Sequence, residues 1–402
     1  MRLLITSGFW PTRTNPITGI FVVQQTEALA QVGCQIDVIL PSPFWKPASH
    51  FLSVDELGLR SESVKLHRVS TGRLPERMST HPWVLRANAK TYGACIRRRL
   101  RTLLASGHRG WNGCIVHGLR YTGMSLRHWR DLVQGRSAVV LHGVDPALKD
   151  GPAAPARREV VGANLGEGPG HVILVGSRLR EYALGLGVPE ASIKVVSNGT
   201  EIPDVAMASC GQRPGGATRR IVSVSNLIPL KGIDLNLRAL AMVLDSRPNL
   251  SWEYRIVGNG PHRKELEALT QGLGLSDRVS FLGRISYHDT MQEIWDADIF
   301  SLPSWGEAFG IVYLEAMARM RPVIGCIGNG PADFIASGID GFLVPPKNVQ
   351  AVATVLEKLL RDPALCAAVG RRAYRTALDF SWEANAFRMI ELLDLSASTY
   401  GI

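Results

Sequence analysis

The chain has 402 residues, of which 46% are hydrophobic and 20% charged. This composition excludes a disordered or fibrous protein and suits two α/β domains that each bury a core. The formal net charge of +10 favours an anionic partner, and charge alone leaves nucleic acid, an anionic membrane surface and a phosphorylated ligand open.

The N-terminal apolar run is too short for a signal peptide, so we expect it to form the first strand. The apolar stretches fall short of the roughly 18 residues that span a bilayer. The six cysteines are widely spaced, with no Cys-x-x-Cys pair. These features predict a cytoplasmic protein in a reducing compartment.

Short β-rich runs alternate with amphipathic segments, which is typical of parallel strands joined by helices. We expect six strands in the first half, over 3–6, 36–41, 114–118, 137–143, 171–177 and 193–199. We expect six more in the second half, over 220–226, 252–260, 279–283, 298–304, 322–326 and 341–346. The fold class is therefore α/β, with two Rossmann-like domains.

The domain boundaries follow from a change in composition. Residues 200–220 are rich in proline, glycine and small side chains, which predicts a linker. It separates a first domain over 1–199 from a second over 221–379. An amphipathic helix within 380–402 either ends the second domain or crosses back to the first.

Two residues of the first half stand where α/β sheets bind ligands. Gly19 precedes an amphipathic helix and lets the backbone approach a ligand closely, although an ordinary tight turn is the alternative. His142 ends an apolar strand, at the edge where open sheets bind ligands. Packing at the domain boundary explains a lone histidine equally well.

Residues 83–104 predict one helix with an apolar stripe and a cluster of arginines. The stripe is expected to pack on the first sheet, so that Arg97, Arg98, Arg99 and Arg101 project outward. Two interpretations remain open: a solvated helix face, or a patch for an anionic membrane or an acceptor.

The second half carries the strongest local pattern. Over 301–325 a strand runs into a glycine-containing loop and a helix that begins near Ile311, a place where backbone N–H groups suit a diphosphate. Glu307 and Glu315 frame this helix start. Carboxylates repel phosphate, so we expect sugar hydroxyls at Glu307 and ribose hydroxyls at Glu315. The alternative is that both are ordinary helix acids.

Lys231 and Gly232 follow another strand of the second half. A lysine on a glycine-flexed loop can reach a diphosphate as a point charge. By itself a Lys-Gly pair is more often a surface turn.

Taken together, these motifs resemble those of the retaining GT-B glycosyltransferases of family four. The matching segments keep the family's order over nearly the whole chain: the Gly19 loop, His142-Gly143-x-Asp145, Ser197–Gly199, Asn226–Gly232, Gly258–Pro261 and Glu307-x7-Glu315. The opening and the His-Gly-x-Asp motif look most like bacterial cell-surface polysaccharide glycosyltransferases.

The resemblance implies a GT-B fold, with parallel sheets facing across a cleft. It also implies a nucleotide-sugar donor, in the first instance a UDP-sugar, and a glycan, lipid-linked or small-molecule acceptor. No cofactor is implied. The protein would be cytoplasmic, either free or in peripheral contact with the inner face of the plasma membrane.

The resemblance assigns roles to individual residues. The expected catalytic residues are His142, Lys231 and Glu307, with Lys231 on the diphosphate and Glu307 on the sugar. The expected donor-binding residues are Gly19, Asn226, Gly258, Arg284, Phe309, Gly310, Ile311 and Glu315. Asn226 departs from the family, which usually has arginine there, and Arg284 is the candidate substitute.

No metal is expected in this scheme. The single Asp-x-Asp, Asp296-Ala297-Asp298, stands at a helix-to-strand junction, which favours a structural role. The leaving phosphate can itself take the acceptor's proton, while Lys231 and backbone donors stabilise the developing charge.

Parts of the sequence suggest three other functions. An NDP-sugar epimerase of the same double fold remains the alternative, and a requirement for an acceptor separates it from a transferase. A dinucleotide-dependent oxidoreductase fails because Arg263 replaces the third glycine of the fingerprint. A nucleic-acid-binding module lacks a dense basic stripe with interleaved aromatics.

Overall fold

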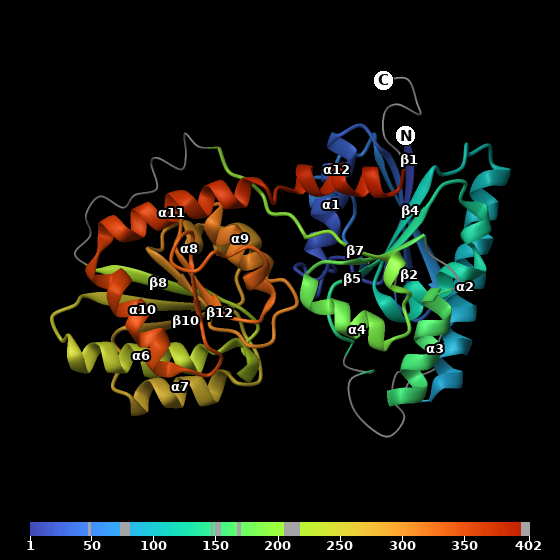
Figure 1. Ribbon diagram of the computed structural model, residues 1–402. Helices are drawn as coiled ribbons and strands as arrows, with labels where there is room; N and C mark the ends of the chain where they lie inside the picture. The colour runs from blue at the N-terminus through green and yellow to red at the C-terminus, as the bar shows by residue number, and fades with distance from the viewer. Residues whose placement is uncertain are drawn as a thin grey trace. The chain divides into compact units, whose positions relative to one another are not determined.

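The computed structural model describes residues 1–46, 50–72, 81–145, 148, 154–166, 170–204 and 218–394. The chain divides into two compact units, each with its own sheet (Figure 1). Unit 1 comprises Met1–Gly199 with Trp382–Ile402, and unit 2 comprises Thr200–Ser381. Most of the expected linker, residues 205–217, lies outside the described residues.

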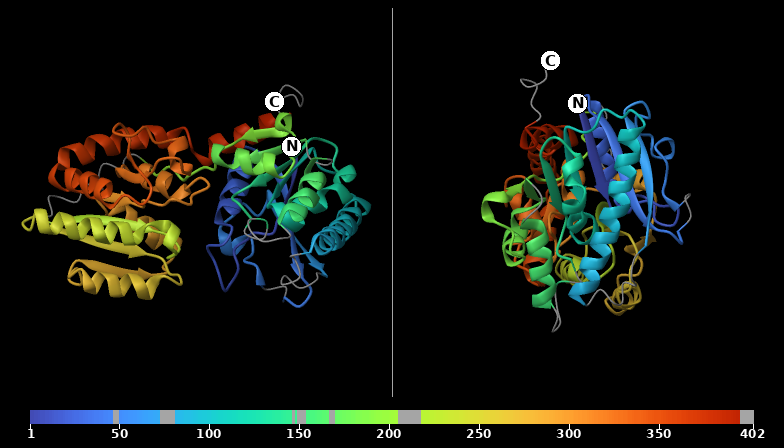
Figure 2. Two further views of the ribbon diagram at one scale, coloured as in Figure 1. Left: turned by 60° about the horizontal axis from the view of Figure 1, so that its bottom comes forward. Right: turned by 90° about the vertical axis from the view of Figure 1, so that its right-hand side faces the viewer.

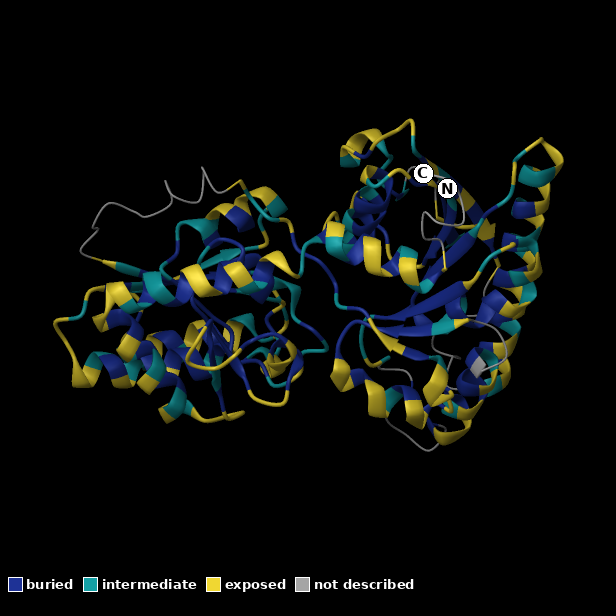
Figure 3. Cartoon of the chain, turned by 45° about the horizontal axis from the view of Figure 1, so that its top comes forward, coloured by how far each residue is buried: buried dark blue, intermediate teal, exposed yellow. Residues whose placement is uncertain are grey.

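Unit 1 contains seven parallel strands in the order β3-β2-β1-β4-β5-β6-β7. They are β1 (Arg2–Ser7), β2 (Gln35–Pro43), β3 (Val64–Thr71), β4 (Gly113–His117), β5 (Ser137–Leu141), β6 (His171–Leu174) and β7 (Ile193–Val195). The strand order reverses between β1 and β4, which makes this the switch point of the sheet. The central strands are buried on both sides, as parallel sheets between helices are (Figure 3).

The expectation of six strands in the first half was wrong, because β3 was missed. This edge strand alternates buried and exposed positions, and its exposed positions carry polar and basic side chains such as Lys65 and Arg68. Its sequence therefore lacks the continuous apolar run by which the buried strands were found.

Helices cover both faces of the unit 1 sheet (Figure 1). α1 (Ile20–Gln31) and α12 (Trp382–Leu392) share one face, and α2 (Pro82–Ala105) and α3 (Ala154–Gly166) lie on the other; α4 (Arg180–Gly185) precedes β7. Two buried amides join α12 to unit 1. Gln25 donates to Asn385 Oδ1 at 2.7 Å, and Asn385 donates to the Ser197 carbonyl at 2.7 Å. The C-terminal helix therefore packs among elements of the first unit (Figure 2).

Unit 2 contains six parallel strands in the order β10-β9-β8-β11-β12-β13, and all six strands expected in the second half are present. They are β8 (Arg219–Val224), β9 (Trp252–Val257), β10 (Val279–Gly283), β11 (Ile299–Ser301), β12 (Val323–Cys326) and β13 (Phe342–Val344). The order reverses between β8 and β11, so the switch point lies there.

The helices of unit 2 form two layers (Figure 1). One layer holds α6 (Ile233–Ser246), α7 (Arg263–Gly272) and α10 (Val349–Arg361), and the other holds α8 (Tyr287–Trp295), α9 (Ile311–Met317) and α11 (Pro363–Leu378). Three of them begin at capping side chains. Ser286, Asn348 and Asp362 each accept a hydrogen bond from the backbone N–H three residues later, which satisfies a free donor of the first turn.

Candidate functional site

Two charged side chains meet at the switch point of the unit 2 sheet, the edge at which open α/β sheets bind ligands. Lys231 belongs to the loop after β8, and Glu307 to the loop after β11. Lys231 Nζ lies 2.5 Å from Glu307 Oε1, and the two side chains are 18% and 12% exposed. The structure therefore brings together the two residues that the sequence predicted for the diphosphate and the sugar.

Gly232 allows this meeting. It follows Lys231 with a φ of 68°, and a Cβ there would lie 2.4 Å from the Pro303 carbonyl oxygen. The loop after β8 can therefore pack directly on the chain that leaves β11. The Trp305 N–H strengthens this contact by donating to the Leu230 carbonyl at 3.0 Å.

A buried polar network lies within the elements that carry these loops. Asn236, on the first turn of α6, donates to the Ser301 carbonyl at 3.0 Å and accepts from the Ser301 hydroxyl at 2.7 Å. Asn236 also donates to Ser223 Oγ and to Tyr254 OH. These bonds hold α6 to β8, β9 and β11. The sequence analysis missed this network, because its members are far apart in the chain.

The loops after β8, β9 and β10 lie against one another at the same edge. The Leu227 N–H donates to the Asn259 carbonyl at 3.1 Å, and the Gly258 N–H to the Gly283 carbonyl at 2.8 Å. Gly258 has a φ of 127°, and a Cβ there would meet the carbonyl oxygen of Ser225 at 1.8 Å. A glycine is therefore required at this position by the packing of the chain itself.

Two further donor-binding candidates are exposed along these loops. Asn226 directly precedes Leu227, and Arg284 directly follows Gly283. Because neighbouring parallel strands end at one edge, the two residues share that edge with Lys231.

Glu315 is buried on α9, with 8% of the residue exposed. The Tyr287 hydroxyl donates to its Oε1 at 3.0 Å. Burial raises the pKa of the Glu315 carboxyl, while the Tyr287 hydrogen bond and the nearby Arg319 oppose this rise. Glu315 is therefore not a solvated helix residue, and the sequence analysis missed Tyr287 as its partner.

The remaining candidates form the entry to α9. Phe309 is buried, and its ring centroid lies 5.3 Å from that of Phe334. Gly310 takes a left-handed conformation with φ 91°, and α9 begins at Ile311 as the sequence predicted. The Gly330 N–H donates to the Glu307 carbonyl at 3.1 Å, which ties this entry to the loop after β12.

In unit 1, two histidines meet beside the switch point. His142 follows β5, and its Nε2 lies 2.8 Å from Nδ1 of His117 at the end of β4. Burial lowers the pKa of His117 to about 3 and that of His142 well below 6.5, so both rings are neutral near pH 7. The sequence analysis missed His117, although it too ends an apolar strand.

Gly19 packs against the backbone of Phe9, whose ring centroid lies 6.3 Å from that of His142. It has a φ of 74°, and a Cβ there would meet the Phe9 backbone carbon at 2.6 Å. Glycine therefore lets the start of α1 pack on the loop after β1. Asp145 of the His-Gly-x-Asp motif pairs with Arg120, whose Nε lies 2.6 Å from its Oδ2.

Comparison with known proteins identifies the fold of the chain and the family of part of it. The chain superposes on sucrose-phosphate synthase from Thermosynechococcus elongatus with a TM-score of 0.73, 21% identity and 98% coverage of both chains. It also superposes on Anabaena Alr3699/HepE, solved in complex with UDP, with a TM-score of 0.69 and 18% identity. This match covers 98% of this chain and all of the HepE chain. Residues 213–376 match the family of group 1 glycosyl transferases. The chain has the GT-B fold, and its residues 213–376 belong to this group 1 family.

Several curated relatives match part of the chain. The chain is 38% identical over 183 residues to an exopolysaccharide phosphotransferase of Streptomyces coelicolor, covering 45% of this chain and 19% of that protein. It is 32% identical over 228 residues to D-inositol 3-phosphate glycosyltransferase of Rhodococcus opacus, a match that covers 53% of this chain and 50% of that protein. It is 33% identical over 200 residues to a GDP-mannose-dependent alpha-(1-6)-phosphatidylinositol monomannoside mannosyltransferase of Mycolicibacterium smegmatis. This match covers 48% of this chain and 52% of that protein. The matches thus span between a fifth and about half of these relatives.

The two aspartates of the Asp-x-Asp make structural contacts, as expected. Asp298 accepts from the Arg220 N–H at 2.7 Å and pairs with Arg219 at 2.8 Å. Asp296 ends α8 and lies 3.9 Å from Arg220. These contacts join the beginnings of β8 and β11, at the edge opposite the switch point. Across the described residues, no three His, Cys, Asp or Glu side chains form a group that could hold a metal ion.

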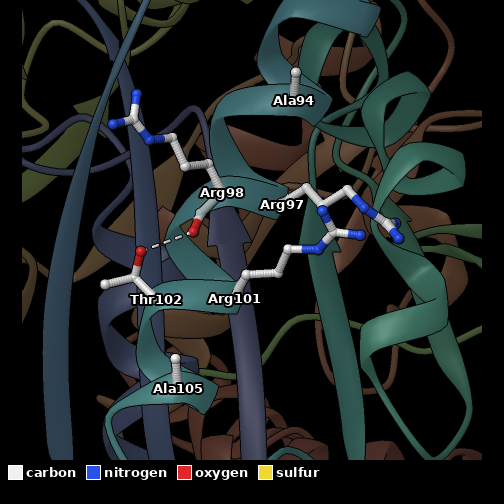
Figure 4. Close-up of a pocket in the computed structure, with 6 residues that line it drawn as sticks. All are labelled: Ala94, Arg97, Arg98, Arg101, Thr102 and Ala105. Carbon is white, nitrogen blue, oxygen red and sulfur yellow. Dashed lines mark hydrogen bonds between the residues drawn. The ribbon is translucent and has the colours of Figure 1, made fainter.

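The expected outward arginine cluster on α2 is only partly present. Arg99 turns inward, and its Nη2 lies 3.1 Å from His67 Nδ1 on β3. Arg97 forms a two-bonded ion pair with Asp131, so this expectation was wrong for Arg99 and only partly right for Arg97. A shallow surface pocket remains on the outer side of the helix (Figure 4), lined by Ala94, Arg97, Arg98, Arg101, Thr102 and Ala105.

The apolar stripe of α2 packs within unit 1, as expected. Its buried members are Val84, Leu85, Tyr92, Ile96 and Leu100. Among the helices that the structure describes, none combines the length and the apolar composition that crossing a bilayer requires.

Proposed function

We propose that this chain is a retaining glycosyltransferase that moves a sugar from a nucleoside diphosphate donor, in the first instance a UDP-sugar, to a glycan, lipid-linked or small-molecule acceptor. The observation that carries the proposal is the Lys231–Glu307 pair at the switch point of the group 1 domain. Two similar proteins support a nucleotide-sugar donor: HepE was solved with UDP, and the M. smegmatis relative is GDP-mannose-dependent.

In this proposal the unit 2 residues divide the donor between them. Lys231 neutralises the diphosphate, and Glu307, relieved of its partner, accepts hydrogen bonds from the sugar hydroxyls. Glu315 accepts from the ribose hydroxyls, with Tyr287 holding one of its carboxylate oxygens in place. Hydroxyls are the partners that a buried carboxyl needs, because leaving it unpaired is costly.

The reaction exchanges one bond at the anomeric carbon for another on the same face. The bond from this carbon to the diphosphate oxygen breaks, and a bond to the acceptor oxygen forms through an oxocarbenium-like transition state. The acceptor's proton passes to the leaving phosphate oxygen. Lys231 stabilises the negative charge that develops on that phosphate, so the scheme needs no metal.

Asn226 leaves this site with one cation fewer than the family pattern has. Arg284, exposed on the loop after β10 at the same edge of the sheet, is the proposed substitute. His142 of unit 1 is neutral and is proposed to bind a substrate hydroxyl rather than the diphosphate charge.

Binding of a panel of UDP-, GDP- and ADP-sugars, read as a thermal shift, tests the donor. A ligand at about 100 times its dissociation constant stabilises the folded chain by roughly 2.7 kcal/mol. No shift with any member would overturn the proposal. The alternative, an NDP-sugar epimerase, would convert the bound donor sugar when no acceptor is present, whereas a transferase requires the acceptor.

We also propose peripheral attachment to the inner face of the plasma membrane through α2. Its outer side exposes a row of basic residues, Arg86, Lys90, Arg98 and Arg101, with Trp83 55% exposed at its start. Each basic residue near an anionic leaflet contributes about 1 kcal/mol, and tryptophan favours the membrane interface. Attachment there would bring a lipid-linked acceptor within reach.

A further inference from the structure

The paired histidines of unit 1 form a site that the proposed reaction does not yet explain. They share one hydrogen bond, between His117 Nδ1 and His142 Nε2. The other nitrogen of each ring, His117 Nε2 and His142 Nδ1, is buried and has no hydrogen-bond partner among the described residues. An unpaired buried nitrogen calls for an explanation, and a ligand group is one.

The shared bond couples the protonation states of the two rings. Each neutral imidazole has one N–H and one bare nitrogen. If His117 Nδ1 carries the proton, His142 Nε2 accepts it, and the His142 proton must lie on Nδ1. In the reverse arrangement His142 Nδ1 is bare, and His117 carries an N–H on Nε2.

The burial of the two rings favours the first arrangement. His117 is 1% exposed, so an N–H on its Nε2 would be a donor without access to a partner. His142 Nδ1 is covered as well, but other atoms of this residue are exposed, so His142 lies nearer the surface than His117. An N–H on His142 Nδ1 can therefore be satisfied by a substrate oxygen that displaces the atoms covering it, whereas His117 has no such exposed side.

The packing around the rings also fixes their orientation. The Phe21 ring centroid lies 4.3 Å from that of His142, and the His117 ring lies 5.1 Å away on a nearly parallel plane. The His117 carbonyl accepts from the Thr122 hydroxyl at 2.9 Å, which holds the end of β4. His142 thus has aromatic neighbours on two elements.

We propose that His117 is a positioning residue that holds His142 as the Nδ1-protonated tautomer, so that this N–H donates to a hydroxyl oxygen of the substrate. The identity of that substrate as a sugar or its acceptor rests on the proposed function. The tautomer of His142 does not, and it can be measured in the protein without substrate.

Three substitutions separate positioning from packing. His117→Asn keeps an amide nitrogen where Nδ1 stands, because both atoms are bonded to Cγ. His117→Gln carries the same amide one bond farther, near the place of Nε2, and is the matched control. His117→Leu removes the donor.

The first measurement is the ¹⁵N chemical shifts of the His142 ring, assigned by comparison with His142→Gln. Wild type and His117→Asn should show a protonated Nδ1, whereas His117→Gln and His117→Leu should show a mixture of tautomers. A protonated Nε2 in wild type would overturn the proposal. This result decides the positioning role even if no sugar donor binds.

The second measurement is kcat/KM in a double-mutant cycle. Loss of a partner that orients a histidine costs about 10- to 100-fold where such a histidine binds a metal, and we expect that range for His117→Leu, with His117→Asn within about threefold of wild type. In a His142→Gln background, His117→Leu should have no further effect, because His117 acts through His142. Independent, multiplying losses would overturn the proposal. If His117→Leu does not fold, the Asn and Gln variants give the same test.

Discussion

Removing the charge of Lys231 should reduce turnover far more than it reduces stability. Lys231→Met keeps the aliphatic stem but removes the cation that lies 2.5 Å from Glu307. Removal of one preorganised group that stabilises transition-state charge costs about 100- to 1000-fold in kcat. We expect a loss in this range with saturating donor.

The stability cost follows from the burial of the pair. At 2.5 Å and an effective dielectric constant near 20, the gross attraction is about 6–7 kcal/mol, much of which offsets desolvation. The two side chains keep 18% and 12% exposure. We therefore expect unfolding to cost about 1–3 kcal/mol less in Lys231→Met, between the values for exposed and fully buried pairs.

A double variant distinguishes the two effects. In Lys231→Met/Glu307→Gln neither charge is left unpaired, so the free energy of unfolding should return to within about 1 kcal/mol of wild type. Turnover should stay at least about 100-fold low. Denaturant titration and donor-saturated initial rates measure both quantities on the same preparations. A double variant that regains turnover would refute a role for Lys231 on the diphosphate, as would a loss below threefold in Lys231→Met.

Four further outcomes can be checked. In a denaturant titration, Gly258→Ala should lose at least about 3 kcal/mol of stability, since its Cβ would lie 1.8 Å from a backbone oxygen at φ 127°. The control Gly272→Ala has open space around the new methyl group and should stay within about 1 kcal/mol of wild type. Transferase activity should survive exhaustive EDTA treatment, and complete loss restored by Mn²⁺ would contradict the metal-free scheme. Cosedimentation with anionic vesicles at low salt should fall when four exposed basic residues of α2 are replaced by glutamine, namely Arg86, Lys90, Arg98 and Arg101. Equal binding by wild type and this variant would remove the membrane proposal. Acid should destabilise unit 1, because the unfolded chain protonates His117 and His142 below pH 6.5, whereas burial holds the folded pKa of His117 at about 3 and that of His142 well below 6.5. The unfolding free energy should fall by up to about 1.4 kcal/mol per pH unit for each histidine as pH drops below 6.5. Denaturant midpoints that stay constant from pH 7 to 5 would contradict this.

The sequence predicted the buried strands well and the edge strand badly. Buried parallel strands are continuous apolar runs, so their composition is sufficient to identify them. β3 instead alternates with exposed side chains such as Lys65. This omission also explains the wrong orientation expected for Arg99, because the group that turns it inward is His67 on β3. The direction of a helix side chain depends on the partner that a neighbouring element provides, and here that partner lies on the strand that the sequence pattern did not reveal.

The site residues could be predicted singly, but their partners could not. Lys231 and Glu307 are 76 positions apart, and both were chosen for their places after strands. Their direct contact depends on β8 and β11 being neighbours in the sheet, which the order of strands along the chain does not reveal. The same holds for Tyr287 and Glu315. His117 differs, because its place at the end of an apolar strand was as visible as that of His142.

Under the proposed function, the difference in charge between the two switch points decides what each can contribute. Burial keeps His117 and His142 neutral, so this histidine pair adds no positive charge toward a diphosphate. Unit 2 must then neutralise the leaving group. Lys231 is already paired with a carboxylate, so its charge becomes fully available only when Glu307 finds hydroxyl partners on the sugar. If Lys231 and Glu307 have the proposed roles, the diphosphate and the sugar bind together, and a free nucleoside diphosphate is a weaker ligand for this pair than the intact donor.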